Sequence, residues 1–160
     1  GQCPKITPKQ FIERIELVRS LDSRPIQATV SGELGSWRES ARAADVLGVS
    51  LYRQTWNETF GHFIYPLTPG YYRLRAALVR DRIEEVIVSE LQAEPWFSAP
   101  IATRPIVEWY DAFTVEMLER NVAFARDAGF AEAYLWGAEW WYALKEAGDD
   151  RLWVEARKLF

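Results

Sequence analysis

Four apolar segments of the sequence end in side chains that could contact a ligand. These endings are Ser31-Gly32-Glu33, Tyr52-Arg53-Gln54, Glu90-Leu91-Gln92 and Trp136-Gly137-Ala138-Glu139. Glu90 directly follows the strand-like run Val86–Ser89, so a rigid element would hold its carboxylate in a partly dry place. Such a carboxylate suits a nucleophile aimed at the anomeric carbon of a sugar. Glu94, in the following segment before Pro95, is the rival carboxylate, and we expect it to form a salt bridge or contact a sugar hydroxyl.

Aromatic residues are the second chemical signal. They make up 14% of the chain, which contains eight tryptophans. Most aromatic side chains build cores, but some form flat platforms on which sugar rings stack. Trp136 lies at a predicted strand end, and Trp96 lies in the loop after Glu94. Further platform candidates, which could equally be core residues packed between helices, are Trp56, Trp140 and Trp141.

The elements that must position these residues follow a repeated strand–helix order. Apolar runs predict strands near residues 25–31, 46–52, 84–90 and 132–137. Thr7, Pro8 and Gln10 form a helix-start signal, and the apolar residues Phe11, Ile15, Val18 and Leu21 follow at helical spacing. Further helices are predicted over 37–44, over 71–82, over 106–128 in two pieces closed by Gly129, and from Asp149 or Asp150 to Leu159.

Short apolar strands that alternate with helices predict an α/β fold with a parallel sheet. No linker or low-complexity segment interrupts residues 1–160, so a single domain is expected. In parallel α/β proteins, ligands bind at the carboxyl ends of the strands. Strand ends are also where chains turn to solvent, which is the alternative explanation for the polar endings.

Composition excludes several other functions. The net charge of −4 and the lack of a basic patch argue against nucleic-acid binding. No apolar run is long enough to cross a bilayer. Cys3 and His62 are the only residues of their types, so no metal site or cofactor is expected. We expect no signal peptide within this chain, and because the only methionine is Met117, we expect a processed product or a piece of something longer.

The order of a Tyr at one strand end, a Glu at the next and a Trp at the last resembles the clan of retaining glycosidases built on (β/α)8 barrels. Glycoside hydrolase family 5 is the nearest comparison. The resemblance implies that the four strands are the fifth to eighth of a barrel, which makes the chain a (βα)4 half of a TIM barrel. It also implies a nucleophile at Glu90, a contact to it from Tyr52 and a sugar platform at Trp136. The segments Ser89–Trp96 and Leu135–Trp141 differ from the common family pattern, so the substrate cannot be carried over.

The same resemblance implies that the general acid/base, usually a Glu after Asn, lies upstream of Gly1. Asn57-Glu58 follows the second strand and does not fit, whereas Glu33 and Glu139 are conceivable substitutes. Other expected sugar contacts are Glu94, Trp96, Gln92 and Arg53.

An unclosed half-barrel would also need a partner, either a second copy or the complementing amino-terminal half. Two alternatives to a glycosidase half remain. One is a non-catalytic half-barrel module that binds carbohydrate or serves a structural role. The other is a flavodoxin-like domain, which is disfavoured because no Gly-rich phosphate loop follows a strand.

Overall fold

The computed structural model describes residues 6–160 as a parallel sheet with helices, joined to a small hairpin. The sheet contains β1 (Gln27–Ser31), β2 (Val46–Leu51), β5 (Glu85–Gln92) and β6 (Ala133–Trp136), and the hairpin contains β3 (Gln54–Asn57) and β4 (Gly61–Ile64). The helices are α1 (Pro8–Leu21), α2 (Trp37–Ser40), α3 (Pro69–Ala77), α4 (Val115–Asp127), α5 (Ala138–Glu146) and α6 (Arg151–Arg157), with 3-10 turns at Ile101–Thr103 and Ile106–Ala112.

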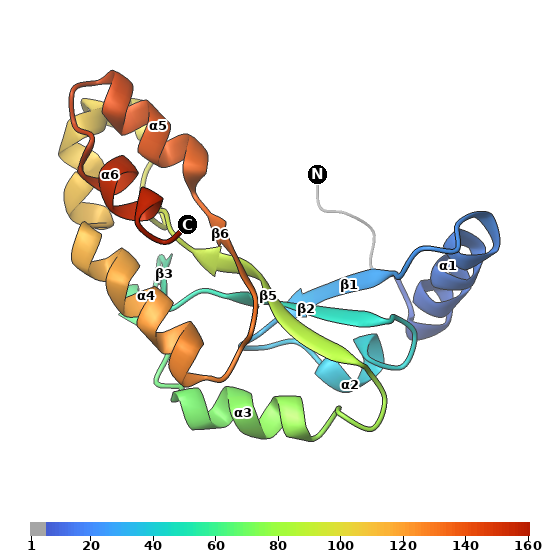
Figure 1. Cartoon of the computed structure of the whole chain (residues 1–160). Helices are drawn as coiled ribbons and strands as arrows, with labels where there is room; N and C mark the ends of the chain where they lie inside the picture. The colour runs from blue at the N-terminus through green and yellow to red at the C-terminus, as the bar shows by residue number, and fades with distance from the viewer. Residues whose placement is uncertain (1–5) are drawn as a thin grey trace.

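All four strands of the sheet are parallel, and their spatial order β1-β2-β5-β6 follows the chain. The predicted α/β fold with a parallel sheet is therefore confirmed. Successive crossovers all step in one direction, which places α2, α3 and α4 along the same side of the sheet (Figure 1). Within residues 6–160, no helix covers the opposite side, which we call the open face.

The core lies between the sheet and these helices. Leu47, Val49, Val88 and Leu91 are buried there and pack with Tyr72 of α3. A second cluster around Phe113, Leu118, Trp140 and Trp141 joins α4, α5 and α6. The side chains on the open face are mostly small or polar: Thr29 is exposed, and Gly48 lies beside Gln27 and Ser89. Ile87, which by strand alternation also faces this side, is 4% exposed and belongs to neither core cluster.

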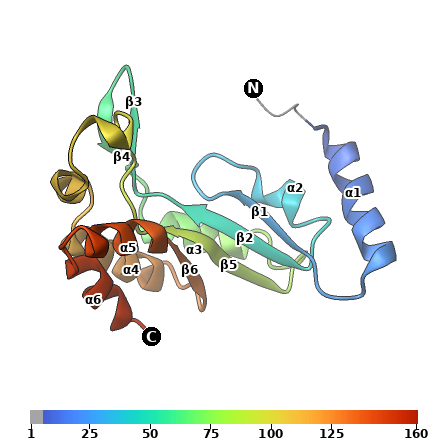
Figure 2. The same ribbon diagram turned by 90° about the horizontal axis from the view of Figure 1, so that it is seen from above.

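Several predicted boundaries are confirmed, and others were wrong. Thr7 and Gln10 form the expected capping box, and Gly129, with φ of 82°, follows α4 in the left-handed conformation. The helix predicted over 37–44 ends at Ser40. The β3–β4 hairpin was not predicted, and it projects from the sheet beyond the end of β2 (Figure 2). Asn57 and Gly61, which form its turn, were the available sequence signal.

Candidate functional site

A local irregularity of β5 sets the direction of Glu90. Val49 of β2 pairs with Val88 and Ser50 with Glu90, so β5 contains one extra residue, Ser89, opposite β2. Val88 and Leu91 both belong to the core on the helix side, whereas the side chain of Ser89 lies on the open face beside Gly48. The bulge thus places Ser89 and Glu90 on the same side of the sheet, and bulges commonly re-aim a side chain in this way. β5 continues to Gln92, so Glu90 lies within the strand rather than after it.

Glu90 lines a pocket of about 300 Å³ at the carboxyl ends of β1, β2 and β5. The pocket walls are Ser31, Glu33, Ser50, Tyr52, Thr55, Tyr65, Glu90 and Trp96. Four of the predicted site residues, Glu33, Tyr52, Glu90 and Trp96, therefore meet in one cavity. Thr55 and Tyr65, on the hairpin and just after it, were missed because the hairpin itself was not foreseen.

Tyr52 connects the carboxylates of the pocket. Its hydroxyl donates a hydrogen bond to Glu90 Oε2 at 3.2 Å, and its ring meets the edge of Trp96 at a centroid distance of 5.7 Å. Burial, followed by the negative charges of Glu90, Glu94 and Glu33, raises the pKa of the Tyr52 phenol well above its ordinary value. The phenol is therefore protonated at neutral pH and can donate its hydrogen bond to Glu90.

Glu33 is a buried carboxylate that fixes the pocket rather than facing a ligand. Its side chain is only 7% exposed, and Oε1 accepts hydrogen bonds from the Tyr52 main-chain N–H at 3.0 Å and the Tyr72 hydroxyl at 3.1 Å. Oε2 accepts from the Ser31 hydroxyl at 3.3 Å. Burial raises the pKa of Glu33, and these hydrogen bonds oppose that rise. The carboxylate thus links the chain after β1 to Tyr52, which follows β2, and to Tyr72 of α3.

A second group of predicted residues lies next to the pocket, at the end of β6. Trp136 is 50% exposed there, and Glu94 is half-buried. Burial raises the pKa of Glu94, a hydrogen bond from the Trp136 side chain opposes the rise, and the charge of Glu139 adds to it. Within residues 6–160, Glu94 has no ion pair, so the salt bridge expected for it is not observed.

Gly137 allows the chain after Trp136 to pass close to Ala93 and Glu94. Its φ of 145° is accessible mainly to glycine, and a Cβ atom there would lie 2.5 Å from the main-chain oxygen of Ala93. We expect Gly137→Ala to cost about 2 kcal/mol or more of stability, since both strain and a backbone clash must be relieved. Urea unfolding would measure this cost, with Gly70→Ala as the control because the space around Gly70 is open enough for a Cβ. Equal unfolding midpoints for the two variants would contradict the close approach.

Gln92 and Arg53 do not face the pocket, which corrects their expected role as ligand contacts. Gln92 is 1% exposed, and its amide exchanges two hydrogen bonds with the Gln54 main chain, at 2.9 and 2.8 Å. Arg53 donates to the main-chain oxygens of Tyr65 and Leu67 and stacks on Phe124. Both side chains therefore contact the main chain next to the hairpin, Gln92 through both ends of its amide and Arg53 through one guanidinium nitrogen.

This role of Gln92 predicts a contrast between two substitutions. Gln92→Ala leaves the half-buried N–H and carbonyl of Gln54 without their partners, which we expect to cost about 1–3 kcal/mol in urea unfolding. Gln54→Ala retains the main chain that Gln92 binds and should cost less than about 0.5 kcal/mol. If the two substitutions cost the same, the paired amide is not what holds the hairpin.

The remaining aromatic candidates are mostly core. Trp140 and Trp141 are both 4% exposed, and the Trp141 indole donates to the main-chain oxygen of Ala93 at 2.6 Å, so neither is a platform. Trp56 lies in β3 opposite His62, and His62 Nε2 is 3.1 Å from the main-chain oxygen of Trp96. Trp96 is 43% and Trp136 50% exposed, so these two are the more accessible platforms, while Trp56 is half-buried.

In residues 6–160, no three or more His, Cys, Asp or Glu side chains gather as metal ligands would. None of the helices described there has the length and apolarity required to span a membrane. Comparisons of the chain with protein-family models, with curated proteins and with solved structures found no match.

Proposed function

We propose that the chain is a (βα)4 half of an eight-stranded barrel. Doubly wound sheets reverse direction at a switch point and carry helices on both faces. Here the strands follow the chain order without reversal, and within residues 6–160 one face lacks helices. A parallel sheet is normally covered on both sides, and closure into a barrel covers the inner side with its own strands. This order favours the half-barrel over a flavodoxin-like domain.

The function that the pocket supports best is the nucleophile half of a retaining β-glycosidase. The observation that carries this proposal is the hydrogen bond from Tyr52 to Glu90 in an aromatic-lined cavity at the carboxyl ends of the strands. Glu90 would attack the anomeric carbon, and Tyr52 would hold the attacking carboxylate in position. Trp136 and Trp96 offer apolar faces for sugar rings, while Glu94 would accept hydrogen bonds from sugar hydroxyls.

A retaining mechanism also needs a second carboxyl group, about 5–5.5 Å from the first, to protonate the leaving oxygen. Both oxygens of Glu33 are occupied by protein donors, and little of the side chain is accessible, so Glu33 is a poor general acid. Glu139 is exposed beyond β6. We therefore propose that this chain supplies the nucleophile and that the proton donor comes from the structure that completes the barrel.

An activated substrate tests the nucleophile without the proton donor. A 2,4-dinitrophenyl glycoside has a leaving group that departs as a stable phenolate, so its glycosyl transfer to a carboxylate needs no proton donor. Glu90 forms a bond to the anomeric carbon while the bond from that carbon to the phenolate oxygen breaks. We expect a burst of about one phenolate per pocket followed by slow turnover, measured by absorbance across β-glycosides of several sugars. A complete absence of burst across the panel would reject the proposal.

The second candidate is a carbohydrate-binding half-barrel without turnover. Full occupation of Glu33 by protein donors favours it, because the pocket then holds one nucleophile and no free acid beside it. Quenching of tryptophan fluorescence by oligosaccharides, without a dinitrophenolate burst, would support this candidate over the first.

A further inference from the structure

One face of the β3–β4 hairpin continues the wall of the pocket. Thr55 in β3 pairs with Phe63 in β4, and the ladder extends one residue further through a hydrogen bond from the Tyr65 main-chain N–H. Directly paired side chains and those two residues apart share a face, so Thr55, Phe63 and Tyr65 lie on one side of the hairpin. Thr55 and Tyr65 line the pocket. The face that carries Phe63 therefore leads from the pocket toward the hairpin turn.

Three aromatic rings follow one another along this face. Phe63 meets Tyr65 at a centroid distance of 5.4 Å and Phe60 at 6.3 Å, each edge to face. Tyr65 and Phe63 are half-buried, while Phe60 at the turn is 76% exposed. We call these three residues the aromatic row. The row begins in the pocket wall and ends in solvent, on the hairpin that projects beyond β2 (Figure 2).

The exposed end of the row is held in a defined place. Asn57 Oδ1 accepts a hydrogen bond from the Phe60 main-chain N–H at 2.8 Å, and Gly61 completes the turn with a φ of 66°. On the other face of the hairpin, His62 Nε2 lies 3.1 Å from the main-chain oxygen of Trp96. Phe60 is thus an exposed ring on an ordered turn, and a preformed surface loses less conformational entropy when it binds a ligand.

The composition of the hairpin favours a neutral ligand. Residues 54–65 contain no Lys or Arg and one acidic residue, Glu58. The hairpin thus lacks the cations with which proteins bind phosphate chains. A β-linked glycan chain presents apolar C–H faces, which suit aromatic rings, and hydroxyl edges, which suit the hydroxyls of Thr55 and Tyr65.

We propose that the aromatic row binds a neutral β-linked glycan chain, one unit of which occupies the Glu90 pocket. The substrate class is then an oligosaccharide or polysaccharide rather than a disaccharide. Continuity with the pocket identifies the occupant, because Tyr65 belongs to both surfaces and a chain that leaves the pocket over Tyr65 meets Phe63 and then Phe60. This inference rests on the carbohydrate site proposed for the pocket, but not on the nucleophilic role of Glu90.

Isothermal titration calorimetry with β-linked glucan, mannan and xylan oligosaccharides, from disaccharide to hexasaccharide, tests the proposal. Affinity should rise at least about 10-fold with chain length for a sugar that binds, because only the longer chains reach Phe63 and Phe60. Phe60→Ala should lower hexasaccharide affinity about 10-fold and leave disaccharide affinity unchanged. Phe60→Trp keeps a flat ring and should retain the affinity, whereas Phe60→Leu, which is apolar but not flat, should behave like Phe60→Ala.

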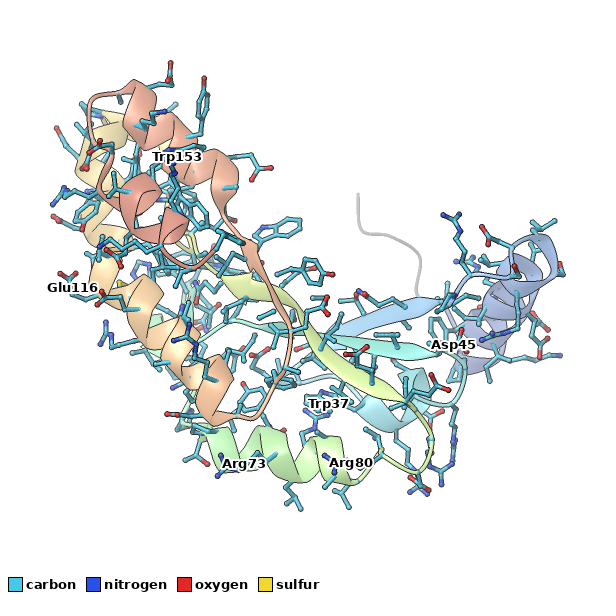
Figure 3. The ribbon with its side chains drawn as sticks, in the orientation of Figure 1. Trp37, Asp45, Arg73, Arg80, Glu116 and Trp153 are labelled. Atoms are coloured by element: carbon cyan, nitrogen blue, oxygen red, sulfur yellow. The ribbon has the colours of Figure 1, made fainter. Side chains whose placement is uncertain are left out.

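Phe160→Ala is the matched control, because it truncates another exposed ring far from the row. Phe160 is 95% exposed and lines a groove beside β6 together with Trp153, which is labelled in Figure 3. The carboxyl terminus lies on the opposite side of the molecule from the hairpin (Figure 2). This substitution should leave binding unchanged at every chain length.

Three results would overturn the proposal: no binding by any oligosaccharide, affinity independent of chain length, or hexasaccharide affinity that Phe60→Ala leaves unchanged. Self-association in sedimentation equilibrium that Phe60→Ala abolished would also overturn it, since protein would then cover the row. Length-dependent affinity without a dinitrophenolate burst would support the row and reject the nucleophile. A burst with affinity independent of length would do the reverse.

Discussion

Glu90→Gln is expected to reduce the dinitrophenolate burst by at least about 10³-fold. The amide has nearly the shape of the carboxylate and can still accept the hydrogen bond from Tyr52, but it is a far poorer nucleophile. The bulge at Ser89 and the packing of Val88 and Leu91 stay intact, so the fold should not change. Stopped-flow absorbance at saturating glycoside would measure the burst rate.

Two further variants show whether this loss is specific to Glu90. Tyr52→Phe removes the hydroxyl that positions Glu90 and should slow the burst about 10–100-fold without abolishing it, because the nucleophile remains. Glu94→Gln alters a carboxylate of the same site and should mainly weaken binding, which raises KM more than it lowers the rate. If Glu94→Gln abolished the burst while Glu90→Gln did not, Glu94 would be the nucleophile and Glu90 would be the contact to sugar hydroxyls.

Glu33→Ala is expected to destabilise the protein by about 2–4 kcal/mol, because it leaves the Tyr52 N–H and the Tyr72 hydroxyl without an acceptor in a buried place. Glu33→Gln is the matched control, since its amide oxygen can accept both hydrogen bonds. Chemical unfolding at neutral pH would give the free energies. Similar costs for both substitutions would show that the carboxylate charge, rather than acceptance of these hydrogen bonds, stabilises the pocket.

The stability difference between the wild type and Glu33→Gln should depend on pH, with a definite sign. Burial raises the pKa of Glu33 in the folded state above its ordinary value of 4.5, so the folded protein binds this proton more tightly than the unfolded chain does. The contribution of Glu33 to stability is therefore fully present below about pH 4.5 and declines as pH rises through the folded-state pKa. The free energy of unfolding of Glu33→Gln minus that of the wild type should increase over this range. A difference that decreased with pH would contradict the raised pKa.

Sequence reasoning predicted the elements whose signals are local. The apolar runs of β1, β2, β5 and β6 and the capping box at Thr7 depend on neighbouring residues, and each was found where expected. The extra residue in β5 has no local signal, because a bulge shows itself only against the register of the neighbouring strand. The hairpin after β2 was missed because its short strands lack a long alternating pattern.

The candidate site was predictable to a similar extent. Strand ends brought Glu90, Tyr52 and Glu33 together, since parallel strands meet at one edge. Direction within a strand end was not predictable: Gln92 lies only two residues from Glu90, yet it points into the core to bind Gln54. Trp140 and Trp141 were ambiguous because a helix following a strand end has one face toward the ligand and one toward the core, and only packing decides between them.

The most direct test of the account is the position of the glycosyl group after reaction with a 2,4-dinitrophenyl 2-deoxy-2-fluoroglycoside. The fluorine slows both formation and breakdown of a glycosyl–carboxylate ester, and the activated leaving group keeps formation accessible, so the adduct accumulates. Protease digestion and tandem mass spectrometry would then locate it. We expect one glycosyl group per chain, attached to Glu90 and absent from Glu90→Gln. Attachment at Glu94 or Glu139 in the wild type, with Glu90 unmodified, would contradict it.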